Sequence, residues 1–164
     1  MGFLARLFGG VPKEEQDGIC LDAPGWELSA TRDVERFLRA LPLLAPEGAV
    51  AYFEGTGESH VTDYLTHIAM PAQTKVAVGI IWPKPDFYHV AVTVSAMEDL
   101  ARFLEQNPTG YFCSHCHVYR DGVILLGWHD AFSDPIYLSR TISENTVKTF
   151  AAAIGASYSQ EPGD

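Results

Sequence analysis

The sequence predicts one α+β domain, with a mainly antiparallel sheet built from two hairpins and with about four helices. Three observations support this fold class. Apolar residues recur at helical spacing in some segments and alternate with period two in others. Most strand-like runs are separated by short turns, which favour antiparallel neighbours over the crossover connections of a parallel sheet. The chain has 164 residues, of which 47% are hydrophobic and 20% charged, so it is long enough to bury one core.

The chain is expected to divide into an N-terminal arm or linker (residues 1–19), the α+β domain (20–158) and a C-terminal tail (159–164). The first residues, MGFLARLFGG, lack the apolar core and cleavage site of a signal peptide. No apolar run approaches the roughly 20 residues that span a bilayer. Three cysteines are too few for a disulfide framework. We therefore expect a soluble protein of the cytoplasm, without a membrane span, whose first residues dock on the domain.

Four segments combine apolar residues at helical spacing with residues that begin or end helices. A serine or threonine followed three residues later by glutamate satisfies the first amides of a helix, and a proline or glycine ends it. In chain order, the expected starts and stops are Thr31–Asp33 and Pro42, Ser59 and Pro71, Ser95–Glu98 and Asn107, and Thr141–Glu144 and Gly155.

The β-rich runs lie between these helices. The expected strands are 49–54, 75–82, 87–94, the two arms of a hairpin within 113–130, and 136–139. The Pro-Lys-Pro-Asp sequence at 83–86 predicts a stiff loop that joins 75–82 and 87–94 into the first hairpin. The expected element order is α-β-α-β-β-α-β-β-β-α.

The second hairpin, CSHCHVYRDGVILLGWHD at residues 113–130, contains two of the three cysteines and three of the six histidines. Its first five residues match the C-x-x-C-H pattern of covalent haem attachment. A strand directs Cys113 and Cys116 to opposite faces, so both cannot bind one porphyrin. We expect no covalent haem.

The turn of this hairpin decides which side chains share a face. Arg120-Asp121-Gly122 predicts a three-residue loop with a left-handed glycine, which places Cys113 opposite His129. A two-residue turn at Asp121-Gly122 shifts the register by one and brings Asp130 opposite Cys113. With the three-residue loop, the polar face holds Cys113, His115, His117 and His129, and the core face holds Phe112, Cys116, Val118, Ile124, Leu126 and Trp128.

The polar face of the hairpin supplies candidate ligands for zinc, namely Cys113, His115, His117 and His129. Zinc binds thiolate and imidazole together, and cross-strand neighbours lie roughly 5 Å apart, within reach of a shared ion. Histidines on a strand also form ordinary hydrogen bonds and ring contacts, and this is the interpretation that we favour. No resident cofactor is expected, with zinc as the one metal left open.

Four aromatic residues near the two hairpins are candidates for the lining of a binding groove, namely Trp82, Tyr88, Trp128 and Phe132. Aromatic rings contribute much of the binding energy in pockets and interfaces. Packing in the core is the alternative role for the same four residues.

Charge provides the main indication of function. The 21 acidic and 11 basic residues give a formal net charge of −10, so the chain lacks the basic footprint of a nucleic-acid-binding protein. No set of side chains predicts a catalytic site. We therefore predict a non-enzymatic protein of the immunity or inhibitor type that binds a macromolecule, with a basic protein as its partner. The alternative is a metal-binding protein or metal-dependent enzyme that uses the Cys113–His129 hairpin face.

Overall fold

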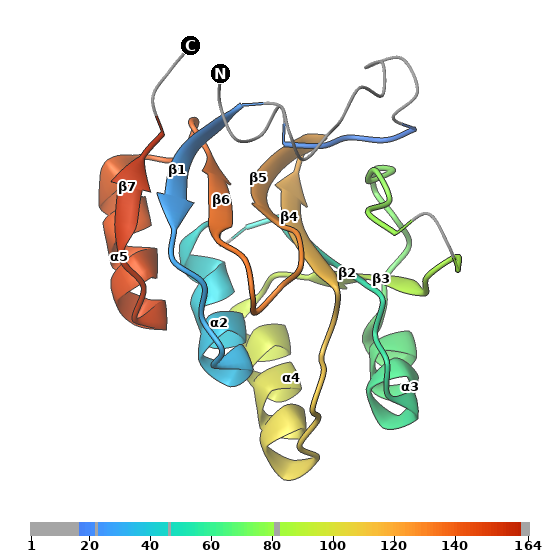
Figure 1. Ribbon diagram of the computed structural model, residues 1–164. Coiled ribbons are helices and arrows are strands. Elements are labelled where there is room, and N and C mark those ends of the chain that lie inside the picture. Colours follow the sequence, from blue (N-terminus) through green and yellow to red (C-terminus); the bar gives the residue numbers. More distant parts are fainter. Residues whose placement is uncertain (1–16, 22, 46, 81–82, 162–164) are drawn as a thin grey trace.

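The computed structural model describes residues 17–161, apart from positions 22, 46 and 81–82. The strands in this part of the chain are β1 (Pro24–Leu28), β2 (Val50–Glu54), β3 (Phe87–Ala91), β4 (His115–Arg120), β5 (Val123–Trp128), β6 (Ile136–Ser139) and β7 (Tyr158–Gln160). The helices are α2 (Val34–Ala40), the short 3-10 helix η2 (Leu41–Leu43), α3 (Ser59–Ile68), α4 (Val94–Gln106) and α5 (Glu144–Ile154). The strands form one sheet in the order β3-β2-β4-β5-β6-β1-β7 (Figure 1), and each neighbouring pair is antiparallel. The predicted fold class is confirmed.

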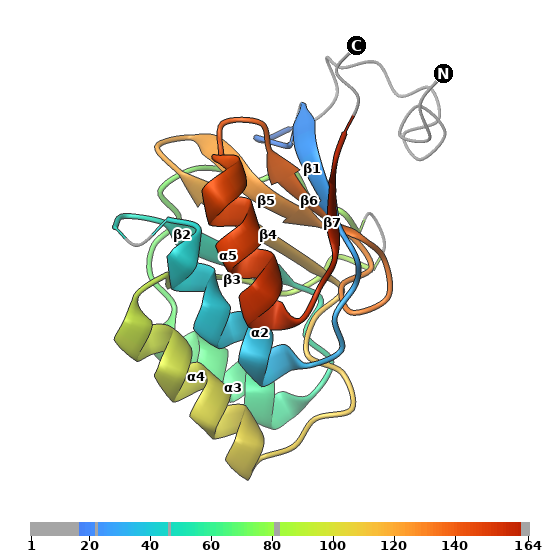
Figure 2. The same cartoon turned by 90° about the vertical axis from the view of Figure 1, so that its left-hand side faces the viewer.

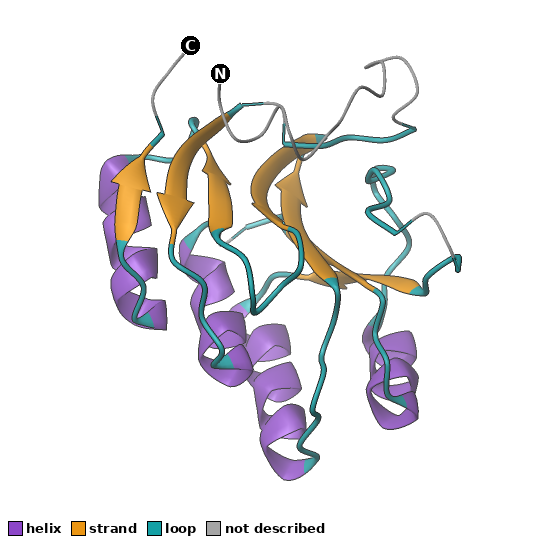
Figure 3. Ribbon diagram, viewed as in Figure 1, coloured by secondary structure: helices purple, strands orange, loops and turns teal. Residues whose placement is uncertain are grey.

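The helices lie on one face of the sheet (Figures 2 and 3). Helix α2 packs against both α4 and α5, and these helices bury Phe37, Leu100 and Phe150 against strand residues such as Trp128. The ring centroids of Phe37 and Trp128 are 4.8 Å apart. The longest helix, α4, has 13 residues, and no helix in the described part of the chain is long and apolar enough to cross a membrane.

The opposite face of the sheet is covered by loops (Figures 1 and 3). The loop between α3 and β3 lies over β2 and β4, and the N-terminal segment runs beside it. The two are joined by a parallel bridge between Ile19 and Val76, with hydrogen bonds from the Ile19 amide to the Lys75 carbonyl (2.8 Å) and from the Ala77 amide to the Ile19 carbonyl (2.9 Å). The apolar cluster on this face is small and consists of Val50, Tyr52, Val76, Tyr119 and Ile124, with Ile19, Leu21 and Met70 packed against it.

Two predicted helix ends are confirmed by their capping geometry. The side chain of Asp33 accepts a hydrogen bond from the Arg36 amide at 2.9 Å and begins α2. Gly155 ends α5 with a φ of 70°, the left-handed conformation that glycine adopts without strain. Strands β2 and β6 also form where the sequence predicts them.

The two predicted capping boxes use different cap residues from those expected. Helix α4 is capped by Thr93, whose hydroxyl accepts from the Ala96 amide at 3.1 Å, and not by Ser95. Helix α5 is capped by Ser143 and not by Thr141. Each segment contains two hydroxyl side chains two residues apart, and the four-residue pattern does not show which one takes the extended conformation of a cap.

The first predicted hairpin differs in the partner of its second arm. Strand β3 pairs with β2 and forms an edge of the sheet, and it has no described partner in residues 75–80. Positions 81–82 lie outside the described residues. The amides of Gly79 and Ile80 donate to the carboxylate of Glu54 and not to a neighbouring strand. This polar contact holds the segment above the sheet.

Strands β1 and β7 were not predicted. β1 begins with Pro24 and Gly25, two residues that are depleted in strands, and β7 has three residues. Because β7 pairs with β1, the sheet extends to Gln160, beyond the predicted domain end at residue 158. The two strands form because they pair with each other, and the local sequence of neither one indicates a strand.

Candidate functional site

The β4–β5 hairpin has a two-residue turn. Arg120 pairs with Val123, and the two residues between them, Asp121 and Gly122, have φ values of 50° and 75°. Positive φ at both positions is characteristic of the type I′ turn, whose twist matches that of a hairpin. The favoured prediction of a three-residue loop is therefore wrong.

A β-bulge on β5 then changes the register again. Tyr119 pairs with Ile124, but Val118 pairs with Leu126, so Leu125 is an extra residue on β5. The two-residue turn pairs Ile124 with Tyr119 on the loop-covered face, although the sequence placed Ile124 in the core, and the bulge then returns Leu126 and Trp128 to the core face. Neither predicted register describes the strand beyond this point.

Cys113 lies in the main core, apart from the histidines with which it was grouped. It is fully buried, as is Cys116, and both belong to the apolar cluster beneath the helices. The prediction that the two thiols face opposite sides is wrong because β4 begins only at His115, and the period-two alternation does not extend back to Cys113. Burial raises the pKa of both thiols, so both are held in the neutral form.

The three remaining candidates, His115, His117 and His129, come together on the loop-covered face. The ring centroid of His129 is 5.1 Å from that of His115 and 5.0 Å from that of His117. Among the described residues, however, no group of three or more His, Cys, Asp or Glu side chains is arranged to hold a metal ion. We therefore assign no metal ligands, and zinc binding stays a prediction.

His117 is the least satisfied polar side chain in this region. It is 3% exposed, and neither ring nitrogen has a hydrogen-bond partner among the residues that the structure describes. Burial, together with the nearby His129 and His115, lowers the pKa of His117 to about 3. A buried imidazole without partners destabilises the fold, and its charged form would do so more strongly. His117 is therefore neutral in the folded protein.

Glu54 is a buried carboxylate that sequence analysis did not select. It is fully buried at the end of β2 and accepts three hydrogen bonds. Tyr52 donates from its hydroxyl at 2.8 Å, and the amides of Gly79 and Ile80 donate at 3.1 and 2.6 Å. Burial and the neighbouring carboxylate raise the pKa of Tyr52. Val50, Tyr52 and Glu54 alternate along one face of β2, and this alternation was the feature of the sequence that could have identified Glu54.

His89 and Tyr119 form a second link between sheet and loop. The Tyr119 hydroxyl accepts from the Gln73 amide at 3.3 Å and lies 3.0 Å from Nδ1 of His89. Because the hydroxyl accepts from the amide, its own proton is available to a neutral His89. Burial lowers the pKa of His89, in agreement with this neutral form.

His115 contacts the loop directly. Its Nδ1 accepts from the Asp130 amide at 3.2 Å, and the edge that carries Nε2 lies against Gly79. A Cβ atom at position 79 would approach Nε2 of His115 to 2.7 Å, so a side chain there would displace either the ring or the loop. Glycine at this position permits the loop to close over the histidine.

We call the buried and half-buried polar side chains of this face the histidine layer, and the segments that lie over them the cover. The histidine layer consists of Tyr52, Glu54, His89, His115, His117, Tyr119 and His129. The cover consists of Ile19–Leu21 and Gln73–Ile80. Sequence analysis identified three members of the layer from their hairpin and missed four, namely Tyr119 of the same hairpin and Tyr52, Glu54 and His89 from β2 and β3.

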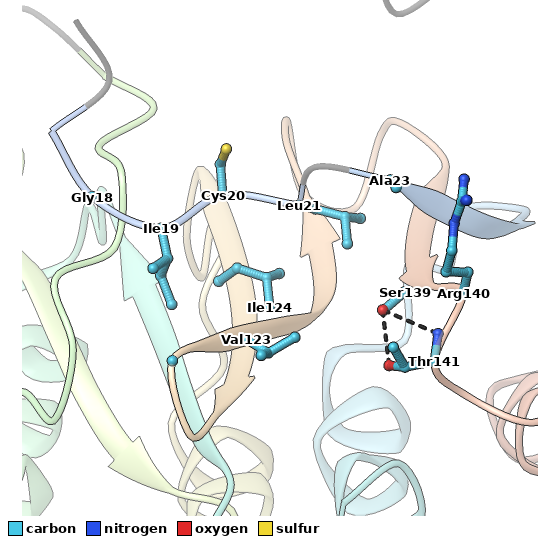
Figure 4. Close-up of a pocket in the computed structure, with 11 residues that line it drawn as sticks. Gly18, Ile19, Cys20, Leu21, Ala23, Val123, Ile124, Ser139, Arg140 and Thr141 are labelled. Atoms are coloured by element: carbon cyan, nitrogen blue, oxygen red, sulfur yellow. Dashed lines mark hydrogen bonds between the residues drawn. The ribbon is translucent and has the colours of Figure 1, made fainter. Parts of the chain in front are cut away.

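A cavity of about 480 Å³ lies between the N-terminal segment, the tip of the β4–β5 hairpin and the end of β6 (Figure 4). In this view the side chain of Ile19 extends toward Ile124, whereas Cys20 points away from the sheet. Ser139 and Thr141 form part of the opposite wall, with their hydroxyl groups 2.9 Å apart. The N-terminal segment therefore crosses the sheet beside a hollow and does not fill the space along its whole length.

The predicted aromatic groove is not formed by the described members of the set. Trp128 is fully buried in the main core, where its Nε1 donates to the Asp134 carbonyl at 2.7 Å. Phe132 packs on Trp128 with ring centroids 4.5 Å apart, and Tyr88 packs against the same core. Trp82 lies outside the described residues. The alternative role, core packing, applies to these three.

The same sheet face carries an acidic surface over β6, β1 and β7. Its members are Glu27, Asp134, Tyr137 and Glu161, all partly exposed, and we call them the Tyr137 surface. Burial, followed by the charges of Glu27, Glu161 and Asp134, raises the pKa of Tyr137 to about 12. Partial burial and the hydrogen-bonded Glu27 raise the pKa of Glu161. Acidic groups are thus crowded around one tyrosine.

Comparisons of this chain with protein-family models, with curated proteins and with solved structures find no match. The interpretation of the site therefore depends on its own residues. Two regions of one sheet face are the candidates, the buried histidine layer beneath its cover and the partly exposed Tyr137 surface.

Proposed function

We propose that the protein binds a basic protein partner through the Tyr137 surface, in the manner of an immunity or inhibitor protein. The observation that carries this proposal is the contact between Glu27 and Glu161. Burial, followed by a hydrogen bond between the two carboxyl groups, holds the pKa of Glu161 above its usual range. Two adjacent carboxylates repel each other when both are charged. An arginine or lysine of a partner would remove that repulsion and gain two anionic acceptors.

Tyr137 supplies the second requirement of a binding surface. It lies beside Glu27 in the sheet and is partly exposed. Tyrosine is enriched among the residues that dominate interface energetics because it combines a large apolar ring with a polar hydroxyl. Carboxylates around an aromatic anchor suit an arginine-rich or lysine-rich surface.

The net charge of −10 supports the same class of partner. Excess charge of one sign accelerates association with a molecule of opposite sign, and the effect weakens as salt screens it. Binding is therefore expected to be fast at low ionic strength and to slow as salt is added.

Site-specific photo-crosslinking in cells tests the proposal. A benzoylphenylalanine at position 137 is expected to crosslink a basic protein. The same amino acid at Lys148, an exposed position on α5, is expected to give no such product. Equal crosslinking from both positions, or none from position 137, would contradict the assignment of the surface.

A charge-matched comparison then tests the role of the carboxylates with the crosslinked partner in purified form. The double substitution Glu27→Gln and Glu161→Gln is expected to weaken binding by about tenfold or more, mainly through the association rate. Asp63→Asn with Glu47→Gln removes the same charge from exposed positions elsewhere and is the control. If the two double variants bind equally, only net charge matters and the Tyr137 surface is not the binding site.

A further inference from the structure

We propose that the cover, Ile19–Leu21 together with Gln73–Ile80, is an acid-labile lid, closed over the histidine layer while its histidines are neutral and released when they take up protons. This proposal is independent of partner binding, because it concerns a different part of the sheet face. The chemical ligand that controls the lid is the proton, and the released state exposes the buried polar residues of β2 and β4.

The cover is attached mainly through polar contacts. The amides of Gly79 and Ile80 donate to Glu54, and the amide of Gln73 donates to Tyr119. The apolar contacts on this face are few compared with those beneath the helices. Segments held by few buried apolar groups open at lower free energy than the core of a domain. The lid can therefore open while the helix-covered face remains folded.

Two histidines of the layer contact residues that hold the cover or belong to it. Nδ1 of His89 lies 3.0 Å from the hydroxyl of Tyr119, which accepts a hydrogen bond from the Gln73 amide of the cover. His115 accepts from the Asp130 amide through Nδ1 and rests against Gly79. A protonated imidazole has no acceptor nitrogen, so protonation of Nδ1 of His115 would remove the hydrogen bond from the Asp130 amide, and protonation of His89 would leave its Nδ1 only a donor toward Tyr119.

Burial of His117 opposes its protonation while the cover is closed. It lies beneath Leu21 at Gly127, where a Cβ atom would be 3.4 Å from Leu21 and 3.6 Å from Nδ1 of His117. A charged imidazole at this place would be buried without a partner among the described residues. Opening of the cover would hydrate the ring, so the open state binds the proton more tightly than the closed state.

Some of the titratable groups around the histidine layer favour protonation of its histidines, and others oppose it. The described titratable groups around the histidines of the layer are Tyr52 and Glu54 from β2, Tyr119 from β4, and Asp130 and Asp134 after β5, and His89 itself comes from β3. In the cover, Lys75 forms an ion pair with Asp17, and Cys20 points away from the sheet. Glu54, Asp130 and Asp134 favour a charged His129, but burial and His115 outweigh them and lower its pKa. The pKa values of His89, His117 and His129 all lie below the ordinary 6.5.

The sign of the pH dependence follows from these shifts. The open state takes up protons below about pH 6.5, whereas a closed-state histidine with a lowered pKa does not, so acid favours opening. For His117 the effect grows until the pH approaches its closed-state pKa of about 3. Between pH 7.5 and 5.0, one such histidine changes the opening equilibrium by about thirtyfold.

Hydrogen exchange of the full chain, followed by mass spectrometry and corrected for the intrinsic pH dependence of exchange, tests the proposal. The protection of residues 73–80 is expected to fall by about thirtyfold or more between pH 7.5 and 5.0, while that of α4 changes little. Glu54→Gln, which turns one acceptor oxygen into an amide donor, is expected to open the lid at neutral pH. Equal loss of protection in α4 and the lid, or no loss in the lid, would overturn the proposal.

Two variants test the role of the histidines. His117→Leu removes a titrating group that makes no hydrogen bond, and it is expected to reduce the pH dependence of lid protection. His67→Leu, at an exposed position of α3, is the matched control and is expected to retain the wild-type dependence. If His117→Leu does not fold, His129→Gln at a partly exposed position serves the same purpose. An unchanged pH dependence in the folded variant would overturn the role of the layer.

Discussion

The two faces of the sheet are built from the same strands but are stabilised in different ways. Beneath the helices, residues such as Phe37, Leu100 and Phe150 form an apolar core whose contacts do not depend on protonation. On the other face, Glu54 and His117 lie at the same depth, where hydrogen bonds and neutral imidazoles take the place of apolar packing. Strand alternation permits this separation, since each strand contributes to both faces. Burial alone therefore does not indicate how firmly a segment is held.

The largest loss of stability is expected from a substitution on the helix-covered face. Phe37→Ala removes a fully buried ring that contacts Trp128, and it should lower the free energy of unfolding by about 3–5 kcal/mol. Leu21→Ala in the cover should cost only about 1–2 kcal/mol, because that side chain is partly exposed. Urea denaturation of both variants measures the comparison. Equal losses would mean that the cover is part of the main core.

The next effect concerns the buried carboxylate. Glu54→Gln should cost about 1–3 kcal/mol, because the amide NH₂ group faces a backbone N–H that needs an acceptor. Urea denaturation measures the change in the free energy of unfolding, and Asp63→Asn on the exposed side of α3 provides the control. A neutral result would indicate that the loop does not depend on this carboxylate.

An increase in stability is expected from His117→Leu. The ring makes no hydrogen bond within the described part of the chain, so leucine removes buried polar atoms without leaving a described partner unpaired. The free energy of unfolding at pH 7.5 should rise by about 1–2 kcal/mol. Thermal and urea unfolding both report this change. A clear loss of stability would show that the imidazole has a partner that leucine cannot replace.

The smallest effect is expected for Tyr119→Phe. Loss of the hydroxyl removes the acceptor of the Gln73 amide and the partner of His89, at a cost of about 0.5–1.5 kcal/mol. Exchange of the Gln73 amide should increase more than that of amides in α4. A uniform increase in both regions would show that the hydroxyl supports the whole fold instead of the cover.

Sequence reasoning succeeded where local patterns suffice and failed where distant segments meet. The cap at Asp33 and the end of α5 at Gly155 follow from a few neighbouring residues. The bulge at Leu125 does not, because an extra residue in a strand has no turn-like signature, yet it decides where the following side chains point. Three histidines were found together because they share one hairpin. Glu54 and His89 were missed as partners because only the sheet brings β2, β3 and β4 side by side.

The central claim, that the loop-covered face of the sheet stays closed only while its histidines are neutral, is tested most directly by the pH dependence of unfolding. Urea denaturation of the wild type and of His117→Leu at pH 7.5 and 5.0 isolates the contribution of His117, because other titrating groups are common to both proteins. The histidine is neutral in the folded state and charged in the unfolded state between pH 6.5 and about 3. Between pH 7.5 and 5.0, the free energy of unfolding of the wild type should therefore fall by about 2 kcal/mol more than that of the variant. Parallel losses in the two proteins would contradict the account.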